Sequence, residues 1–286
     1  MRHGFLLIDK PRGPTSHGAV ATVRRTLAER DVGHLGTLDP AASGLLVLAV
    51  GNKALKVIEF FSGLGKEYVA DVRFGAVSST YDSEGTIDKV ETKPGWVQPD
   101  KGHIQRAIDQ RFTGKIEQVP PTHSAVHIGG VRAYDLARKG IEVEMPKRSV
   151  EISECAVLSY AYPHLRLRVR VSSGTYIRSL AHDLGDVMRC GGYLENLRRT
   201  KVGDWDVEKA VTPDAAKWTD VVPLKEVLAG LPRIDVTDAE AEHLRHGRKI
   251  QREVSAGTWA WFEDLPLAVL VPAKDGSRMA QPRKVL

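Results

Sequence analysis

The chain has 286 residues and a formal net charge of +5, from 41 Lys and Arg against 36 Asp and Glu. This length exceeds that of a usual single domain, the 42% hydrophobic content excludes a disordered chain, and the basic excess mildly favours a polyanionic partner. Two cysteines, Cys155 and Cys190, cannot supply a disulfide framework. No apolar run approaches the roughly 18 residues of a membrane span, so we expect a soluble, cytoplasmic protein.

The N-terminal segment predicts a strand, a turn and a helix. Residues 5–8 form a short apolar run, which favours a buried strand and is too brief for the core of a signal peptide. Two prolines and a glycine within residues 10–14 then force a turn. A helix follows, because Thr15 or Ser16 can cap it and apolar residues recur after them at helical spacing.

Next comes a segment rich in turn residues, followed by a core strand. Residues 31–43 contain several Gly and Pro positions and predict a tight loop of defined shape. The unbroken apolar run 45–50 predicts a strand buried on both faces. Asp39 should therefore lie on a stiff loop beside the core. Further on, residues 68–74 predict a strand and residues 78–88 a polar loop.

Three more elements complete the larger part of the chain. Residues 99–112 predict a helix, and residues 176–188 predict another with an apolar stripe. Residues 165–171 alternate strictly between apolar and basic side chains, which is typical of a strand with one buried face. The basic residues of that strand are Arg166, Arg168 and Arg170.

The pattern breaks near residues 229–232, where we place a domain boundary. We expect a domain over residues 1–230 and a small, β-rich one over residues 232–286. The small unit should begin with a helix capped by residues 237–240 and ended by Gly247, followed by short strands. A unit this short is marginal alone and should dock on the larger domain.

Residues 33–40 read Gly-His-Leu-Gly-Thr-Leu-Asp-Pro and closely resemble the signature loop of the bacterial TruB-type tRNA pseudouridine synthases. Further segments resemble this family in the same order, namely Asp9-Lys10-Pro11, Lys66-Glu67-Tyr68, residues 81–85, residues 174–178 and Leu197-Arg198-Arg199. The resemblance covers about residues 4–205. It implies a mixed α/β (α+β) catalytic domain with a central mixed sheet, flanking helices and a basic cleft. More weakly, the C-terminal residues resemble the small PUA-like RNA-binding module.

The resemblance makes Asp39 the catalytic nucleophile. Conversion of uridine to pseudouridine breaks a carbon–nitrogen bond at the sugar, rotates the freed uracil and rejoins it through carbon 5. A carboxylate can do this by nucleophilic attack without cofactor or metal, because uracil is a tolerable leaving group that can stay in the pocket. The residues alone leave another interpretation open, since an Asp before Pro40 is common in turns.

Other site residues follow from the same resemblance. Arg178 would pair with the nucleophile and keep it ionised. Tyr68 would stack on the target base and assist a later proton transfer, and Tyr176 would form the pocket wall. His34 would fill the space left in the RNA when the target nucleotide turns out, and Asp82 would hydrogen-bond in the same site. Judged alone, the arginine could be solvated, the tyrosines could be core residues, and the histidine could stabilise its turn.

Lys10, Arg198 and Arg199 are candidates for contacts with RNA phosphates. The arginine row on residues 165–171 is a further candidate, although a charged strand face is usually only solvated.

The chain departs from the family where relatives commonly carry a tyrosine and a lysine after paired prolines, because His123 and His127 stand there. Their spacing, like that of His243 and His246, superficially resembles a metal site. Zinc normally needs three or four protein ligands, and no nearby cysteine or carboxylate completes either set. We expect no metal and no cofactor.

We therefore predict a stand-alone enzyme that isomerises uridine 55 in the T-loop of tRNA, binds the T-arm and needs no obligate protein partner. Two alternatives stay open. The chain could bind tRNA and help it fold without catalysis, or it could be the catalytic subunit of an RNA-guided ribonucleoprotein, whose catalytic loop is nearly the same.

Overall fold

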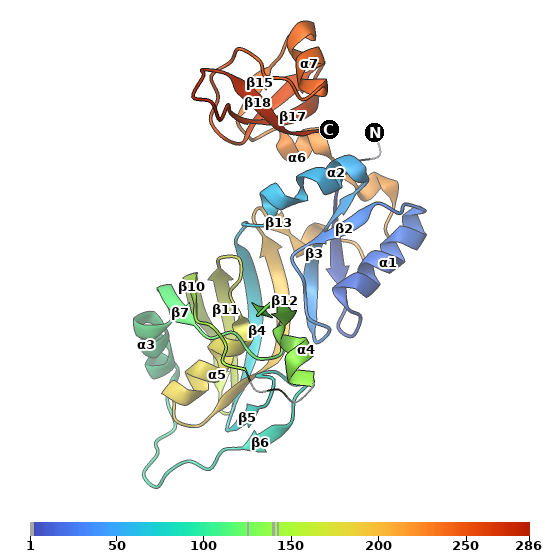
Figure 1. Cartoon of the computed structure of the whole chain (residues 1–286). Helices are drawn as coiled ribbons and strands as arrows, with labels where there is room; N and C mark the ends of the chain where they lie inside the picture. The colour runs from blue at the N-terminus through green and yellow to red at the C-terminus, as the bar shows by residue number, and fades with distance from the viewer. Residues whose placement is uncertain (1–2, 125, 139–140, 142) are drawn as a thin grey trace.

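The computed structural model describes residues 3–124, 126–138, 141 and 143–286. Within these residues, ten strands form one large sheet, drawn from blue to gold in Figure 1. In chain order they are β1 (Gly4–Lys10), β2 (Val32–Leu35), β3 (Ala42–Val50), β4 (Lys66–Phe74), β7 (Gly114–Gln118), β10 (Arg148–Ala161), β11 (His164–Val171), β12 (Gly192–Val202), β13 (Trp205–Asp206) and β14 (Val222–Pro223).

The sheet is mixed. Its main path runs β14-β1-β3-β12-β4-β11-β10-β7, with β2 paired to β3 and β13 to β12. Strands β3 and β12 are parallel, and the other pairings are antiparallel. The prediction of a mixed α/β fold is therefore confirmed.

Strand β3 lies at the centre of the core, as its apolar run predicts. Its residues 45–50 are all 0% exposed. Successive side chains point to opposite faces of a strand, so Leu46 and Leu48 pack into one hydrophobic cluster while Leu45 and Val47 pack into the other. Both faces of the sheet are thus covered around β3.

Helices cover the two faces unequally. The long helices α1, α3 and α5 pack into the first cluster, while α2, η1 and α6 pack into the second. Among the described residues, no helix has the length and apolar character needed to cross a membrane. The helices are α1 (Ser16–Leu27), α2 (Asn52–Val57), α3 (Lys101–Arg111), α4 (Ala133–Arg138), α5 (Ile177–Val187), α6 (Leu224–Leu228) and α7 (Asp238–Arg245), with 3₁₀ turns η1 (Ile58–Phe61), η2 (Val207–Lys209) and η3 (Trp218–Asp220).

The tight loop predicted over residues 31–43 is partly wrong, because β2 lies within it and pairs with β3. Gly33 favoured the loop prediction, although it lies within β2. It is not a turn glycine: a side chain there would collide with Leu55 of α2, so the position is a close approach between elements. The polar loop 78–88 likewise has ordered ends, since β5 (Ala76–Ser78) pairs with β6 (Ile87–Lys89).

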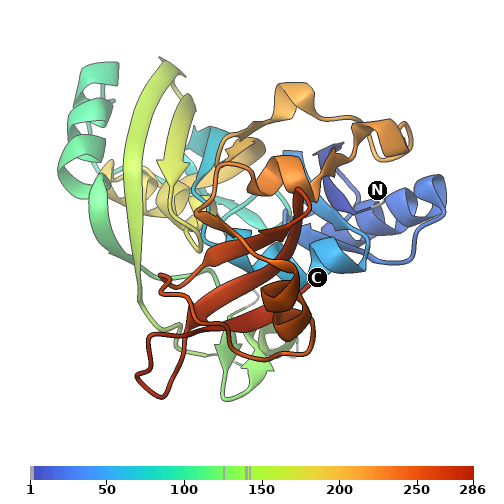
Figure 2. The same cartoon turned by 90° about the horizontal axis from the view of Figure 1, so that it is seen from above.

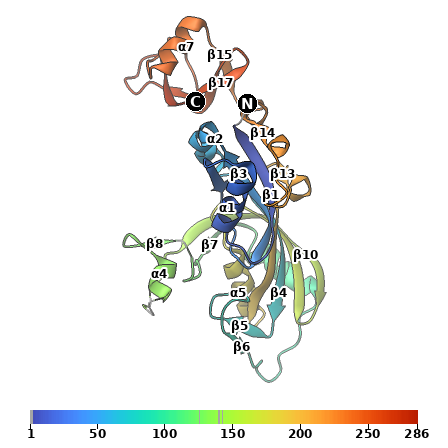
Figure 3. The same ribbon diagram turned by 90° about the vertical axis from the view of Figure 1, so that its right-hand side faces the viewer.

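One small hairpin projects from the body of the molecule. Strands β8 (His127–Ile128) and β9 (Val131–Arg132) pair with each other and precede α4. Figure 3 shows β8 and α4 standing away from the large sheet on one side.

The C-terminal residues form a separate sheet, which Figure 2 shows in front of the molecule. Its order is β15-β16-β17-β18, and Thr237 and Glu240 make the predicted capping box of α7. The C-terminal unit docks on η1, as expected. The ring of Phe60 packs edge-on against that of Trp259, with centroids 5.8 Å apart, and Glu59 forms an ion pair with Lys284 at 2.8 Å. The strands are β15 (Arg233–Asp235), β16 (Thr258–Phe262), β17 (Leu265–Pro272) and β18 (Ala280–Val285).

Candidate active site

Asp39 lies on the segment between β2 and β3, with its carboxylate directed at a buried arginine. Its Oδ2 is 3.1 Å from Nη2 of Arg178, near the start of α5. The Asp39 side chain is 46% exposed, whereas that of Arg178 is 9% exposed. The carboxylate is therefore held from behind by a fixed cation while its front faces solvent, which suits a nucleophile.

The Arg178 guanidinium is itself fixed on several sides. Its Nη1 lies 3.3 Å from Oδ2 of Asp82 and donates to the Thr80 carbonyl, while its Nη2 also donates to the His123 carbonyl at 3.0 Å. The planar fork of an arginine can satisfy such a set, which an ammonium cannot. The contact with His123 uses the main chain, so it does not depend on the histidine that replaces the family's usual residue.

Asp82 is buried and belongs to an ordered turn. Its Oδ1 accepts hydrogen bonds from the Thr80 hydroxyl at 2.6 Å and the Glu84 amide at 3.0 Å. Its neighbour Tyr81 has a left-handed backbone (φ 65°), and its ring stacks on His182 of α5 with centroids 3.9 Å apart. Asp82 thus contacts Arg178, and Arg178 in turn contacts Asp39.

Tyr68 and Tyr176 lie on different elements of the fold. Tyr68 of β4 is 9% exposed and packs in the same hydrophobic cluster as Leu38 and Ile177, the sequence neighbours of Asp39 and Arg178. Tyr176 is the residue before α5, and its main chain exchanges hydrogen bonds with the Gln118 side chain at 2.8 and 2.9 Å. Tyr176 lies two residues before Arg178 in the chain. The places of both tyrosines around a bound base, and their roles there, stay predictions.

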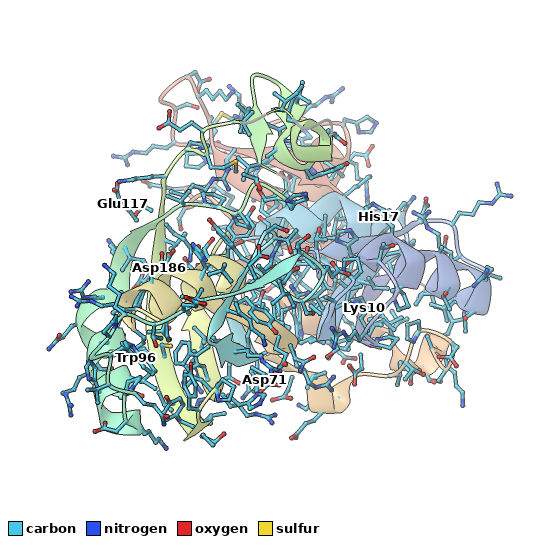
Figure 4. The ribbon with its side chains drawn as sticks, turned by 90° about the horizontal axis from the view of Figure 1, so that it is seen from below. Lys10, His17, Asp71, Trp96, Glu117 and Asp186 are labelled. Atoms are coloured by element: carbon cyan, nitrogen blue, oxygen red, sulfur yellow. The ribbon has the colours of Figure 1, made fainter. Side chains whose placement is uncertain are left out.

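His34 lies on β2 against His17 of α1, with ring centroids 5.2 Å apart and the rings perpendicular. Burial lowers the pKa of His34, and the nearby His17 and Arg199 lower it further, so the neutral ring is favoured. Its Nδ1 is buried and has no hydrogen-bond partner among the described residues. Figure 4 labels His17 and Lys10 on the side of the molecule formed by the N-terminal elements.

Two of the predicted phosphate contacts are wrong. Lys10 is 0% exposed and donates to the carbonyls of Pro11 and Pro14, both at 2.8 Å. Arg199 is 1% exposed and donates only to main-chain carbonyls, the closest being that of Leu45 at 2.7 Å. Both cations hold backbone inside the fold, because each side chain is buried and its nitrogens donate to main-chain carbonyls.

The remaining basic candidates are exposed but already paired. Arg198 makes a two-point contact with Asp9, at 3.0 and 2.8 Å, and its side chain is 43% exposed. The row on β11 is half-exposed, and each of its arginines meets a carboxylate on a neighbouring strand. The pairs are Arg166 with Asp71, Arg168 with Glu154, and Arg170 with both Glu67 and Glu154.

Sequence reasoning missed several residues that shape the site. The sequence suggests Ser16 only as a helix cap, yet its hydroxyl contacts Leu38, next to Asp39. Arg12 links the turn after β1 to the Asp82 loop by donating to Ser83 and to Asn196. Neither role has a local sequence signal, because both partners are distant along the chain.

The residues that the structure describes contain no group of three or more His, Cys, Asp or Glu side chains placed to hold a metal ion.

Comparison with known sequences agrees with this geometry. The family model "TruB family pseudouridylate synthase (N terminal domain)" matches residues 24–177, and "tRNA pseudouridylate synthase B C-terminal domain" matches residues 178–225. The chain belongs to the TruB family of pseudouridine synthases. Asp39 and Arg178 lie in these two matched parts.

Curated relatives extend the similarity over nearly the whole chain. The tRNA pseudouridine synthase B of Thermobifida fusca is 41% identical over 297 residues, covering 99% of this chain and 98% of the relative. That of Leifsonia xyli subsp. xyli is 42% identical over 280 residues, covering 94% of this chain and 89% of the relative.

Among solved structures, a chain of a Cbf5-Nop10-Gar1 complex superposes with a TM-score of 0.72 at 24% identity, covering 99% of this chain and 84% of that one. At this identity the likeness shows the fold.

Proposed function

We propose that this chain isomerises uridine 55 in the T-arm of tRNA to pseudouridine, with Asp39 as the nucleophile. The observation that carries the proposal is the half-exposed Asp39 carboxylate on a buried Arg178, at the loop that identifies the family. The relatives that match nearly the whole chain are named tRNA pseudouridine synthase B, which supports tRNA as the substrate.

The proposed chemistry needs only groups of this chain. The Asp39 carboxylate attacks carbon 1 of the ribose, and the bonding pair leaves with nitrogen 1 of uracil. The freed ring rotates, and its carbon 5 displaces the carboxylate from the sugar. Carbon 5 then loses its proton and nitrogen 1 gains one, so the overall change is an isomerisation.

The surrounding residues support these steps. Arg178 directs the Asp39 carboxylate, and Asp82 fixes the guanidinium from its other side. We propose that Tyr68 stacks on the everted base and carries the later proton transfer, with Tyr176 at the pocket wall and His34 in the vacated space of the RNA loop. Base eversion costs a few kcal/mol, so a side chain that fills this space offsets part of the cost.

We further propose that residues 232–286 act as a PUA-like RNA-binding domain beside a catalytic domain of residues 1–230. The separate four-stranded sheet that begins with β15 supports this division. Its docking through η1 supports a fixed spacing between the two RNA-binding surfaces.

The decisive test compares Asp39→Asn with the wild type on an unmodified tRNA transcript labelled at carbon 5 of uridine, with no guide RNA added. Release of the label should fall roughly 10⁴-fold or more, because removal of a nucleophile abolishes the covalent route. Binding of tRNA should stay within a few-fold of the wild type. Asp71→Asn is a matched control, since Asp71 pairs with Arg166 on β11.

The outcomes separate the alternatives. Turnover by Asp39→Asn contradicts the nucleophile assignment. A wild type that binds tRNA without releasing label indicates a folding or binding protein, and release only with an added guide RNA indicates a ribonucleoprotein subunit. A transcript with cytidine at position 55 should release no label from its remaining uridines, and the isolated T-arm should remain a substrate.

A further inference from the structure

The backbone of the nucleophile loop, residues 36–40, is held at every carbonyl oxygen. Five consecutive carbonyls each accept a hydrogen bond, and the donors come from three different parts of the chain. The pairs are Gly36 with Arg199 Nη2, Thr37 with Arg199 Nη1, Leu38 with Ser16 Oγ, Asp39 with the Ala42 amide, and Pro40 with the Gly13 amide. The backbone of such a loop has little freedom to shift.

Arg199 joins this loop to the strand that follows it. Its Nη2 and Nη1 donate to the carbonyls of Gly36 at 3.2 Å and Thr37 at 3.4 Å, and its Nε donates to Leu45 of β3 at 2.7 Å. The guanidinium therefore fixes the distance between the start of the loop and β3. A lysine could not bond all three carbonyls, because its single ammonium lacks the planar fork.

Close strand packing makes this contact possible. Arg199 of β12 is in register with Gly44 of β3, and a side chain at position 44 would collide with the main chain of Arg199. On its other side Arg199 is in register with Tyr68 of β4, and directly paired residues of antiparallel strands point to the same face. The side chains of Arg199 and Tyr68 therefore lie on the same face of the sheet.

Ser16 holds the loop next to the nucleophile. Its buried hydroxyl donates to the Leu38 carbonyl and accepts from the Leu38 amide, both at 2.8 Å. Ser16 is the first residue of α1, so the helix start and the loop are tied at one residue. These two hydrogen bonds fix the main chain of Leu38, the residue before Asp39.

We propose that Arg199 and Ser16 are positioning residues that hold the loop backbone so that Asp39 meets the sugar carbon in line. The proposal rests on the proposed function of Asp39. Neither side chain has to touch the RNA. Their effect should appear in the rate of the chemical step, because small misplacements of a reacting group can cost about 100-fold in rate.

The test measures single-turnover rate constants and tRNA dissociation constants for Arg199→Lys and Ser16→Ala. We expect the rate constant to fall roughly 30- to 100-fold for Arg199→Lys and about tenfold for Ser16→Ala. Dissociation constants should stay within about threefold. Arg24→Lys is the matched control, because Arg24 also donates to one carbonyl, that of Val32 at 2.7 Å, but at the far end of β2. It should change neither quantity by more than about twofold.

Amide hydrogen exchange provides a measurement that does not depend on activity. The Leu38 amide should exchange at least about tenfold faster in Ser16→Ala than in the wild type, because its acceptor is gone. Unchanged rate constants, or losses that lie wholly in tRNA affinity, overturn the proposal. If Arg199→Lys does not fold, Ser16→Ala decides alone. A wild type without turnover would refute the proposed function, and exchange at Leu38 would still decide whether the loop is held as described.

Discussion

Two groups of arginines in the larger part of the chain lie in different surroundings. Arg178 and Arg199 are buried and bond to carboxylates or carbonyls around the nucleophile loop. The row on β11 is half-exposed, and each member meets an acid on a neighbouring strand. All five residues carry the same charge, so charge alone does not distinguish a buried arginine from a surface one.

Burial accounts for the difference. An exposed ion pair is screened by water and salt and contributes about 0–1 kcal/mol. A buried arginine must have its donors satisfied, and removing its partners leaves a costly charge, so its geometry is fixed. We therefore expect changes in the buried group to alter catalysis strongly and changes in the exposed row to alter little.

Among the arginine variants, the largest expected effect comes from Arg178→Lys, which keeps the positive charge and removes the planar guanidinium. A lysine cannot meet Asp39 and Asp82 together, so one carboxylate loses its partner. We expect the single-turnover rate of pseudouridine formation to fall about 100- to 1000-fold, with tRNA affinity within about threefold. Arg168→Lys should leave the rate unchanged. Equal losses in both variants would abolish the distinction between the two groups.

Much of the fold could be predicted from periodicity. The apolar run of β3 and the alternation of β11 were sufficient because each pattern reports local burial directly. Strand β2 could not be predicted, since Val32–Leu35 lies among turn residues and is extended only because β3 offers it an edge. Long-range pairing decided this element over local preference.

The site was predicted unevenly for the same reason. Asp39, Arg178 and Asp82 come together as the family resemblance implies. Lys10 and Arg199 were assigned to RNA phosphates because sequence shows their charge and not their exposure. The contact of Ser16 with Leu38 joins residues 22 positions apart, so no local pattern could indicate it.

A middle-sized effect is expected for Arg198→Gln. Arg198 lies on the same strand as Arg199, yet its side chain is 43% exposed and forms an ion pair with Asp9. If it also meets a phosphate, the variant should bind tRNA about three- to tenfold more weakly at moderate salt. The slope of log affinity against log salt should become shallower by about one. Filter binding across a salt series measures both, and an unchanged slope would restrict Arg198 to its contact with Asp9.

The smallest effect is expected for Arg168→Gln, and it tests the exposed row most directly. Arg168 contacts Glu154 at 2.6 Å, but Glu154 also meets Arg170 at 3.0 Å, so the carboxylate keeps a partner when Arg168 is removed. The free energy of unfolding should change by less than about 1 kcal/mol in urea denaturation. Affinity for tRNA should change less than about twofold, because each arginine of the row is already paired with a carboxylate on a neighbouring strand. A tenfold loss of affinity would show that RNA displaces Glu154, and the β11 face would then belong to the interface.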